Sequence, residues 1–222
     1  MEDPTPPPTP EWIAPSEVGT IPPNGVRAVA GEDAIHLEWQ PLIDNDIAEV
    51  RIFRADSAAV DFERIANVDI SQNPSRNFYD DFNVPVDTTV FYYLRAVDKS
   101  DNPSEFPDTL MIFHLLRQSS LSEFEDPPPP VTTFSWYIEP PESNAGLYSV
   151  EIADAGENTV QISPLIQRTG YARQAPEHWT VTDSLHPGQQ YSWRVYAYGL
   201  LDSLNRPHAM SISGWRVFEI AE

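Results

Sequence analysis

Apolar and polar residues alternate along residues 190–198, and this alternation predicts a β-strand. The inward positions recur at every second residue, at Tyr191, Trp193, Val195 and Ala197. A turn signal, Pro187 followed by Gly188, comes just before the run. Alternation with a period of two after such a turn is typical of an antiparallel strand that buries one face.

Similar alternation predicts strands in both halves of the chain. In the first half, the predicted strands are 35–39, 50–54 and 91–98. In the second half, they are 133–136, 148–152 and 213–220. No stretch of useful length shows the periodicity of an amphipathic helix. The pattern therefore predicts an all-β chain.

Several motifs on these strands resemble fibronectin type III domains. The run Leu185-x-Pro-Gly-x-x-Tyr-x-Trp-x-Val-x-Ala197 resembles the corner before strand F and strand F itself. In the first half, Trp39-Gln-Pro41, Asp44-Asn-Asp-Ile47 and Ala96–Ser104 resemble the bacterial version of the family. The resemblance implies two tandem immunoglobulin-like (fibronectin type III) antiparallel β-sandwiches.

The resemblance also assigns roles to single residues. It implies that Trp39 is the core tryptophan of strand B. It implies a tyrosine corner at Tyr191, whose hydroxyl bonds to the backbone just upstream. Val90 stands at the equivalent position of the first half, so the first domain is expected to lack this corner.

Proline and charge patterning predict how the domains are connected. The expected segments are a Pro-rich acidic N-terminal tether (1–21), a first domain (22–117), a Pro-rich linker (118–130) and a second domain (131–222). The linker holds Pro127–Pro130, a stiff polyproline segment. Trp12 and Ile13 are unusual in a tether and are expected to dock onto the first domain.

Composition excludes several classes of partner and chemistry. The chain has 13 Lys and Arg against 34 Asp and Glu, a net charge of −21. Such a surface repels nucleic acids and anionic membrane surfaces. The absence of cysteine excludes disulfides and thiolate chemistry. There is neither a transmembrane run nor a signal peptide at Met1.

No catalytic or metal motif appears, so we expect no enzyme activity, no metal and no cofactor. The sequence holds no HExxH, GxSxG or phosphate-binding loop. Six aspartates lie in predicted loops: Asp44, Asp46, Asp80, Asp81, Asp98 and Asp101. They are expected to cap turns, with calcium binding left open.

The outward positions of two neighbouring strands form the candidate binding face. Those positions carry Arg51, Phe53, Phe91, Tyr93 and Arg95. Aromatic rings flanked by arginines can stack on a sugar or pack against a partner protein. The alternatives are a cross-strand ladder that only stabilises the sheet, or a face buried against the other domain.

The corresponding outward set of the second domain differs in composition. There, Arg194, Tyr196 and Tyr198 are predicted to face outward from strand F, with Ser149 and Glu151 opposite on strand C. Glu151 and Arg194 are expected to pair across the strands at an exposed position, where such a pair contributes little.

The resemblance implies a fold and not a function, because this fold hosts many unrelated roles. The expected role is a non-catalytic binding or spacer protein acting through protein–protein contacts. The acidic Pro-rich start is similar to the tether of bacterial lipoproteins. It implies an exported protein of the bacterial cell surface or periplasm, and it leaves an N-terminal lipid anchor open. The alternative is a carbohydrate-binding accessory protein of a polysaccharide-utilisation system, with a glycan in place of the protein partner.

Overall fold

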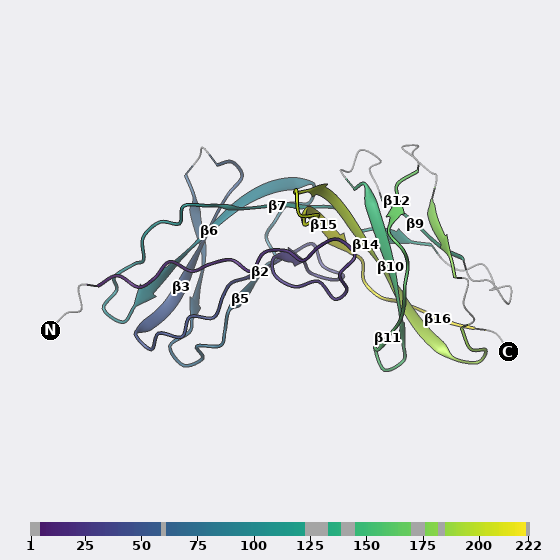
Figure 1. Cartoon of the computed structure of the whole chain (residues 1–222), viewed down its shortest axis with the longest axis horizontal. Helices are drawn as coiled ribbons and strands as arrows, with labels where there is room; N and C mark the ends of the chain where they lie inside the picture. Colours follow the sequence, from purple (N-terminus) through teal and green to yellow (C-terminus); the bar gives the residue numbers. More distant parts are fainter. Residues whose placement is uncertain are drawn as a thin grey trace.

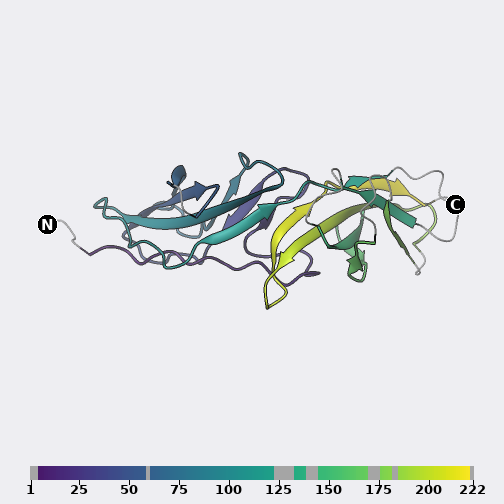
Figure 2. The same cartoon turned by 90° about the horizontal axis from the view of Figure 1, so that it is seen from above.

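The computed structural model describes residues 5–58, 61–122, 133–138, 145–169, 176–181 and 185–220, which form strands and no helix. The prediction of an all-β chain is confirmed. Within this described part, no helix is long and apolar enough to cross a membrane. The strands build two β-sandwiches that lie end to end along the long axis of the molecule (Figures 1 and 2).

The first sandwich has the strand order of a fibronectin type III domain. One sheet has the order β1-β2-β5 and consists of β1 (Arg27–Ala28), β2 (Ile35–Glu38) and β5 (Phe78–Asp81). The facing sheet has the order β4-β3-β6-β7 and consists of β4 (Glu63–Asp69), β3 (Ile47–Ala55), β6 (Thr88–Asp98) and β7 (Met111–Leu115). All pairings within this sandwich are antiparallel.

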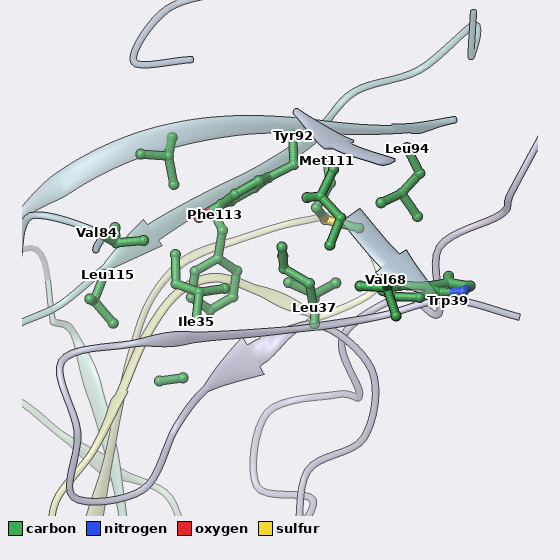
Figure 3. Packing of buried hydrophobic residues seen from close by; sticks show 14 of the residues in the cluster. Ile35, Leu37, Trp39, Val68, Val84, Tyr92, Leu94, Met111, Phe113 and Leu115 are labelled. Carbon is green, nitrogen blue, oxygen red and sulfur yellow. The ribbon is translucent and has the colours of Figure 1, made fainter. Parts of the chain in front are cut away.

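Alternating inward residues of the two sheets fill the core of the first sandwich. Figure 3 shows Ile35 and Leu37 of β2 facing Tyr92 and Phe113 from the opposite sheet. Trp39 is fully buried in this cluster, as the sequence predicts. The tyrosine corner is absent, and the buried carboxylate of Asp81 instead accepts a hydrogen bond from the Tyr92 hydroxyl (2.9 Å).

The second sandwich repeats this plan with more irregular strands. One sheet has the order β13-β9-β8 and consists of β13 (Glu177–Thr180), β9 (Thr133–Tyr137) and β8 (Ser120–Leu121). The other is built around β10 (Leu147–Asp154) and β14 (Gln190–Leu201). Its remaining strands are β11 (Thr159–Ile162), β12 (Ile166–Gln167), β15 (Pro207–Ile212) and β16 (Arg216–Glu219).

The tyrosine corner predicted at Tyr191 is present. The backbone N–H of His186 donates to the Tyr191 hydroxyl (3.1 Å), and the hydroxyl donates to Gln189 Oε1 (3.0 Å). The ring itself is buried in the second core.

Replacing Tyr191 with phenylalanine should therefore lower the free energy of unfolding by about 1 kcal/mol, the usual net value of one hydrogen bond. The buried ring is retained, so the fold should persist. Urea unfolding of the variant and the wild type measures the difference. An unchanged midpoint would show that the corner bond contributes nothing.

Part of the predicted linker belongs to the second sandwich. Of residues 118–130, the structure describes 118–122, and Pro127–Pro130 lie outside the described residues. β8 lies in this stretch and pairs with β9 of the second sandwich. Leu116 is buried in the second core. The chain therefore leaves the first sandwich after β7 and joins the second sandwich at β8.

The predicted N-terminal tether packs along the first sandwich in its described part. Pro7 and Pro10 are buried and Pro8 is exposed, consistent with one packed face of an extended polyproline segment. The backbone N–H of Ile13 donates to the carbonyl of Glu38 (2.9 Å). Trp12 forms a bridge with Trp39, so Trp12 and Ile13 dock as expected.

The sheets of the two sandwiches join at the interdomain junction. β7 of the first sandwich pairs in parallel with β15 of the second, with His114 opposite Ala209 and Leu115 opposite Met210. The result is one ten-stranded sheet that runs through both sandwiches. In Figure 2, β7 and β15 meet at the middle of the elongated molecule.

The junction buries side chains that the sequence predicts to be exposed. Tyr196 and Tyr198 are 0% and 2% exposed and belong to the core cluster of the first sandwich, together with Met210 and Ile212. Ser149 and Glu151 on β10 are buried as well, and Arg194 is mostly buried. The prediction of an outward face was wrong here, because the first domain covers part of this sheet.

Candidate functional site

The candidate binding face lies on the outer side of β3 and β6 of the first sandwich. The register places Phe53 opposite Tyr93 and Arg51 opposite Arg95. The rings of Phe53 and Tyr93 stack with centroids 4.5 Å apart and an angle of 12° between their planes. The structure thus brings together four of the five residues that the sequence predicts on this face.

Two further rings complete the aromatic cluster, defined here as Phe53, Phe62, Tyr93 and Phe106. Phe62 precedes β4, and its ring centroid lies 4.9 Å from that of Tyr93. Phe106 lies in the loop between β6 and β7, with its centroid 5.7 Å from that of Tyr93. Sequence reasoning missed both, because neither belongs to an alternating strand pattern.

The rings of the aromatic cluster differ in exposure, and Tyr93 is buried although the sequence predicts it at an outward position. Tyr93 is only 9% exposed, because the other three rings surround it. This burial raises the pKa of the Tyr93 hydroxyl above its ordinary value, with Arg95 acting in the opposite direction. Phe106 is 63% exposed and is the ring of the cluster most open to solvent.

Both arginines on the face are engaged within the chain. The Arg95 guanidinium lies over the ring of Phe106, 4.3 Å from its centroid, and Nε donates to the carbonyl of Ser104 (2.9 Å). Arg51 donates to Glu49 (2.7 Å) and Asp101 (2.8 Å). The hydrogen bond to Glu49 is the main cause that raises the pKa of Arg51.

Phe91 lies outside this arrangement. It is half-buried on β6, between Ala55 of β3 and Ile112 of β7. Tyr93 is the next outward residue along the strand. Among the described residues, those that line the pocket beside the cluster do not include Phe91.

An open pocket of about 560 Å³ lies beside the aromatic cluster. Its lining residues are Asp61, Phe62, Tyr93, Phe106, Pro107 and Leu110. A second hollow of about 620 Å³ lies between the N-terminal segment and the loop at 105–111. Phe106, Pro107 and Leu110 line both. Together they form a ridge of apolar side chains with a hollow on each side.

Asp98 and Asp44 cap turns, whereas Asp80 and Asp81, which were predicted in loops, lie on β5 and pair with His36 (2.6 Å) and Arg54 (2.8 Å). Asp98 Oδ1 accepts hydrogen bonds from the backbone N–H groups of Ser100 (2.9 Å) and Asn102 (2.7 Å). Burial opposes ionisation of Asp98, but the hydrogen bonds from Asn102 and Ser100 outweigh it and lower its pKa. Asp44 accepts from the N–H of Asp46 in the same way (3.0 Å). Within the described ranges, no three acidic or histidine side chains come together as metal ligands.

Two tryptophans of the second domain lie outside the aromatic cluster. Trp179 lies on β13, and its ring stacks on that of Phe134 with centroids 5.9 Å apart. It is partly buried and packs against the second core. Trp215 is partly exposed, and the Arg194 guanidinium lies 4.1 Å from its ring centroid.

Comparison with protein-family models and with curated proteins gives no match to this chain. Among solved structures, the FN1–FN3 domains of chicken CNTN1 are 14% identical, over 97% of this chain and 66% of that chain, with a TM-score of 0.38.

A two-domain fibronectin type III segment of chicken tenascin is 13% identical, over 96% of this chain and 99% of that chain, with a TM-score of 0.34. A β-1,2-glucanase from Parabacteroides distasonis is 24% identical, over 51% of this chain and 14% of that chain, with a TM-score of 0.33. All three TM-scores are low, so the fold assignment rests on the strand order and register described above.

Proposed function

We propose that this chain is a non-catalytic interaction module that holds two β-sandwich domains at a fixed spacing and engages a partner protein. The observation that carries the proposal is the interdomain junction. Domains in one chain are expected to move relative to each other unless the interface between them is large and hydrophobic. Here the interface includes a shared sheet and a shared core.

Hydrogen bonds at several points support a rigid junction. The backbone N–H of Leu116 donates to the carbonyl of Met210 (3.0 Å), next to the parallel pairing of β7 and β15. The N–H of Gly31 donates to the carbonyl of Ile212 (2.9 Å). The N-terminal segment also contributes, since the N–H of Val18 donates to the carbonyl of Asn205 (2.9 Å). These bonds come from three separate segments of the first domain.

We expect the two domains to tumble in solution as one body. Backbone ¹⁵N relaxation and residual dipolar couplings should give one diffusion tensor and one alignment tensor for β3, β6, β10 and β14. Two independent tensors would show that the spacing is not fixed and would overturn the proposal.

A junction variant provides the matched comparison. The double substitution Met210→Ala and Ile212→Ala removes buried apolar contact between the sandwiches and should allow the tensors to separate. The control is Val217→Ala, an exposed residue of the second domain that should leave the single tensor unchanged. Circular dichroism establishes that both sandwiches of the double variant remain folded.

The cellular location is part of the proposal and rests on the sequence. The resemblance to bacterial fibronectin type III domains and the acidic Pro-rich start support an exported protein of the cell surface or periplasm, with a lipid anchor left open. The net charge of −21 supports a partner other than nucleic acid or an anionic membrane surface. Fractionation of the native cells with an antibody to the chain tests the location, and recovery in the cytoplasm would overturn it.

The carbohydrate-binding alternative rests on one observation, the exposed ring of Phe106 beside an open pocket with a carboxylate from Asp61. An exposed aromatic ring offers a stacking surface for the apolar face of a sugar. Titration with a neutral gluco-oligosaccharide and with an arginine peptide separates this alternative from binding of a protein partner.

A further inference from the structure

The pocket beside the aromatic cluster has three aromatic walls. Phe62, Tyr93 and Phe106 all line it, and their rings are inclined to one another. The angle between ring planes is 56° for Phe62 and Tyr93 and 65° for Tyr93 and Phe106. Rings set at such angles present both faces and edges to one space. A cation placed over a ring face is attracted by the quadrupole of the ring.

Acidic residues line the pocket and the neighbouring hollow. Asp61 lines the pocket, and the hollow on the other side of Phe106 is lined by Glu11, Glu105 and Asp108. Among the described residues that line these two hollows, all the charged side chains are acidic. Aromatic rings and carboxylates together attract a positive charge and disfavour an anion.

The chain itself shows that this cluster accepts a cation. The Arg95 guanidinium lies 4.3 Å from the ring centroid of Phe106. It is held there by hydrogen bonds from Nε and a terminal nitrogen to the carbonyl of Ser104. Arg95 does not line the pocket itself, although the Phe106 ring that it covers does. A second cation entering the pocket would meet the rings of Phe62 and Tyr93 as well as the carboxylate of Asp61.

We propose that this pocket receives a lysine or arginine side chain from a partner protein. The proposal rests on the interaction role proposed above and names the chemistry of the partner. Charge complementarity identifies the occupant, because a basic side chain combines a cation for the rings and Asp61 with an alkyl stem for Pro107 and Leu110. The two hollows on either side of the ridge leave room for the residues that flank that side chain.

The test is a titration of the full chain, labelled with ¹⁵N, with the peptide acetyl-Gly-Arg-Gly-amide. The comparison peptide carries citrulline in place of arginine, which keeps the shape and removes the charge. We expect saturable chemical-shift changes at the amides of 61, 62, 93, 106 and 108–110 with the arginine peptide, and weaker binding at high salt. The citrulline peptide should give at most a small fraction of these shifts.

Two pairs of variants locate the binding. Phe106→Ala and Asp61→Asn should each weaken binding of the arginine peptide by about two- to fivefold, the effect of losing one exposed cation–π or charge contact. Their controls are Phe82→Ala, a ring exposed to a similar extent elsewhere on the first domain, and Glu32→Gln, an exposed carboxylate outside the pocket. Neither control should change the affinity.

Three results would overturn the inference. Equal shifts with the arginine and citrulline peptides would show that charge is not recognised. If the chemical-shift changes are spread over the acidic surface and are the same in Phe106→Ala, the net charge attracts the peptide without a specific site. Shifts at the pocket with a neutral gluco-oligosaccharide and none with the arginine peptide would make the pocket a glycan site. Independent tumbling of the two domains would overturn the proposed rigid spacing and leave the pocket proposal standing. Failure of one proposal can therefore be distinguished from failure of the other.

Discussion

Replacing Glu151 with alanine is expected to lower the free energy of unfolding by about 3–5 kcal/mol, the range for breaking a buried ion pair. Glu151 Oε2 accepts hydrogen bonds from Arg194 Nε (2.8 Å) and from the Tyr196 hydroxyl (2.7 Å), and Oε1 accepts one from Thr159 (2.6 Å). The alanine variant leaves the Arg194 guanidinium mostly buried without its counter-charge. Denaturant unfolding monitored by circular dichroism measures the loss.

Two further variants separate the buried charge from the hydrogen bonds. Glu151→Gln keeps an acceptor for the Tyr196 hydroxyl and removes the charge, so its loss should lie between those of the wild type and Glu151→Ala. The double variant Glu151→Ala, Arg194→Met removes both charges and should lose less than the sum of the two single changes. If the losses in the free energy of unfolding are additive, the two residues are not coupled. If Glu151→Ala loses less than about 1 kcal/mol, the pair contributes no more than an ordinary exposed ion pair.

The strands of both sandwiches could be predicted because each buries one face. Tyr191 and Trp193 alternate with polar residues, and the buried face of an antiparallel strand requires this pattern. The tyrosine corner followed from its motif and is present at the expected residue. Local sequence determines these features, since the residues involved are close together in the chain.

The junction could not be predicted in the same way. Tyr196 continues the outward positions of β14, and its sequence context resembles that of an exposed strand residue. It is buried because β15 pairs with a strand of the other sandwich. The parallel pairing of His114 with Ala209 depends on where two distant segments of the chain meet. The local sequence pattern around either residue does not predict this meeting point. Ser120 and Leu121, which the sequence places in the linker, pair with β9, and this long-range pairing also leaves no local signal.

The candidate face was partly predictable. Phe53 and Tyr93 occupy outward positions of neighbouring strands, and the structure stacks them as cross-strand neighbours. Phe62 and Phe106 were missed because they lie outside the alternating runs. A signal was present all the same, since each is an isolated ring between acidic or proline neighbours, as in Asp61-Phe-Glu63 and Glu105-Phe-Pro107. An aromatic residue in such a context has no core partner along its own segment.

Replacing Phe113 with alanine is expected to lower the free energy of unfolding by about 3–5 kcal/mol, as for other large rings removed from a core. Phe113 is fully buried on β7, among the core residues shown in Figure 3. The matched control is its neighbour Ile112, which lies on the opposite face of β7 and is 41% exposed. Ile112→Ala should cost much less, because much of its side chain already contacts water.

The same variant tests whether the two sandwiches unfold together. Tyr196 and Tyr198 of the second sandwich pack in the core that contains Phe113, so a loosened first core should also destabilise the second sandwich. Fluorine-labelled tryptophan can report on each sandwich, with Trp39 in the first core and Trp193 in the second. We expect both signals to disappear at one lowered melting temperature. Loss of the Trp39 signal well before that of Trp193 would show that the junction does not couple the domains, and a spacer built on it would be flexible.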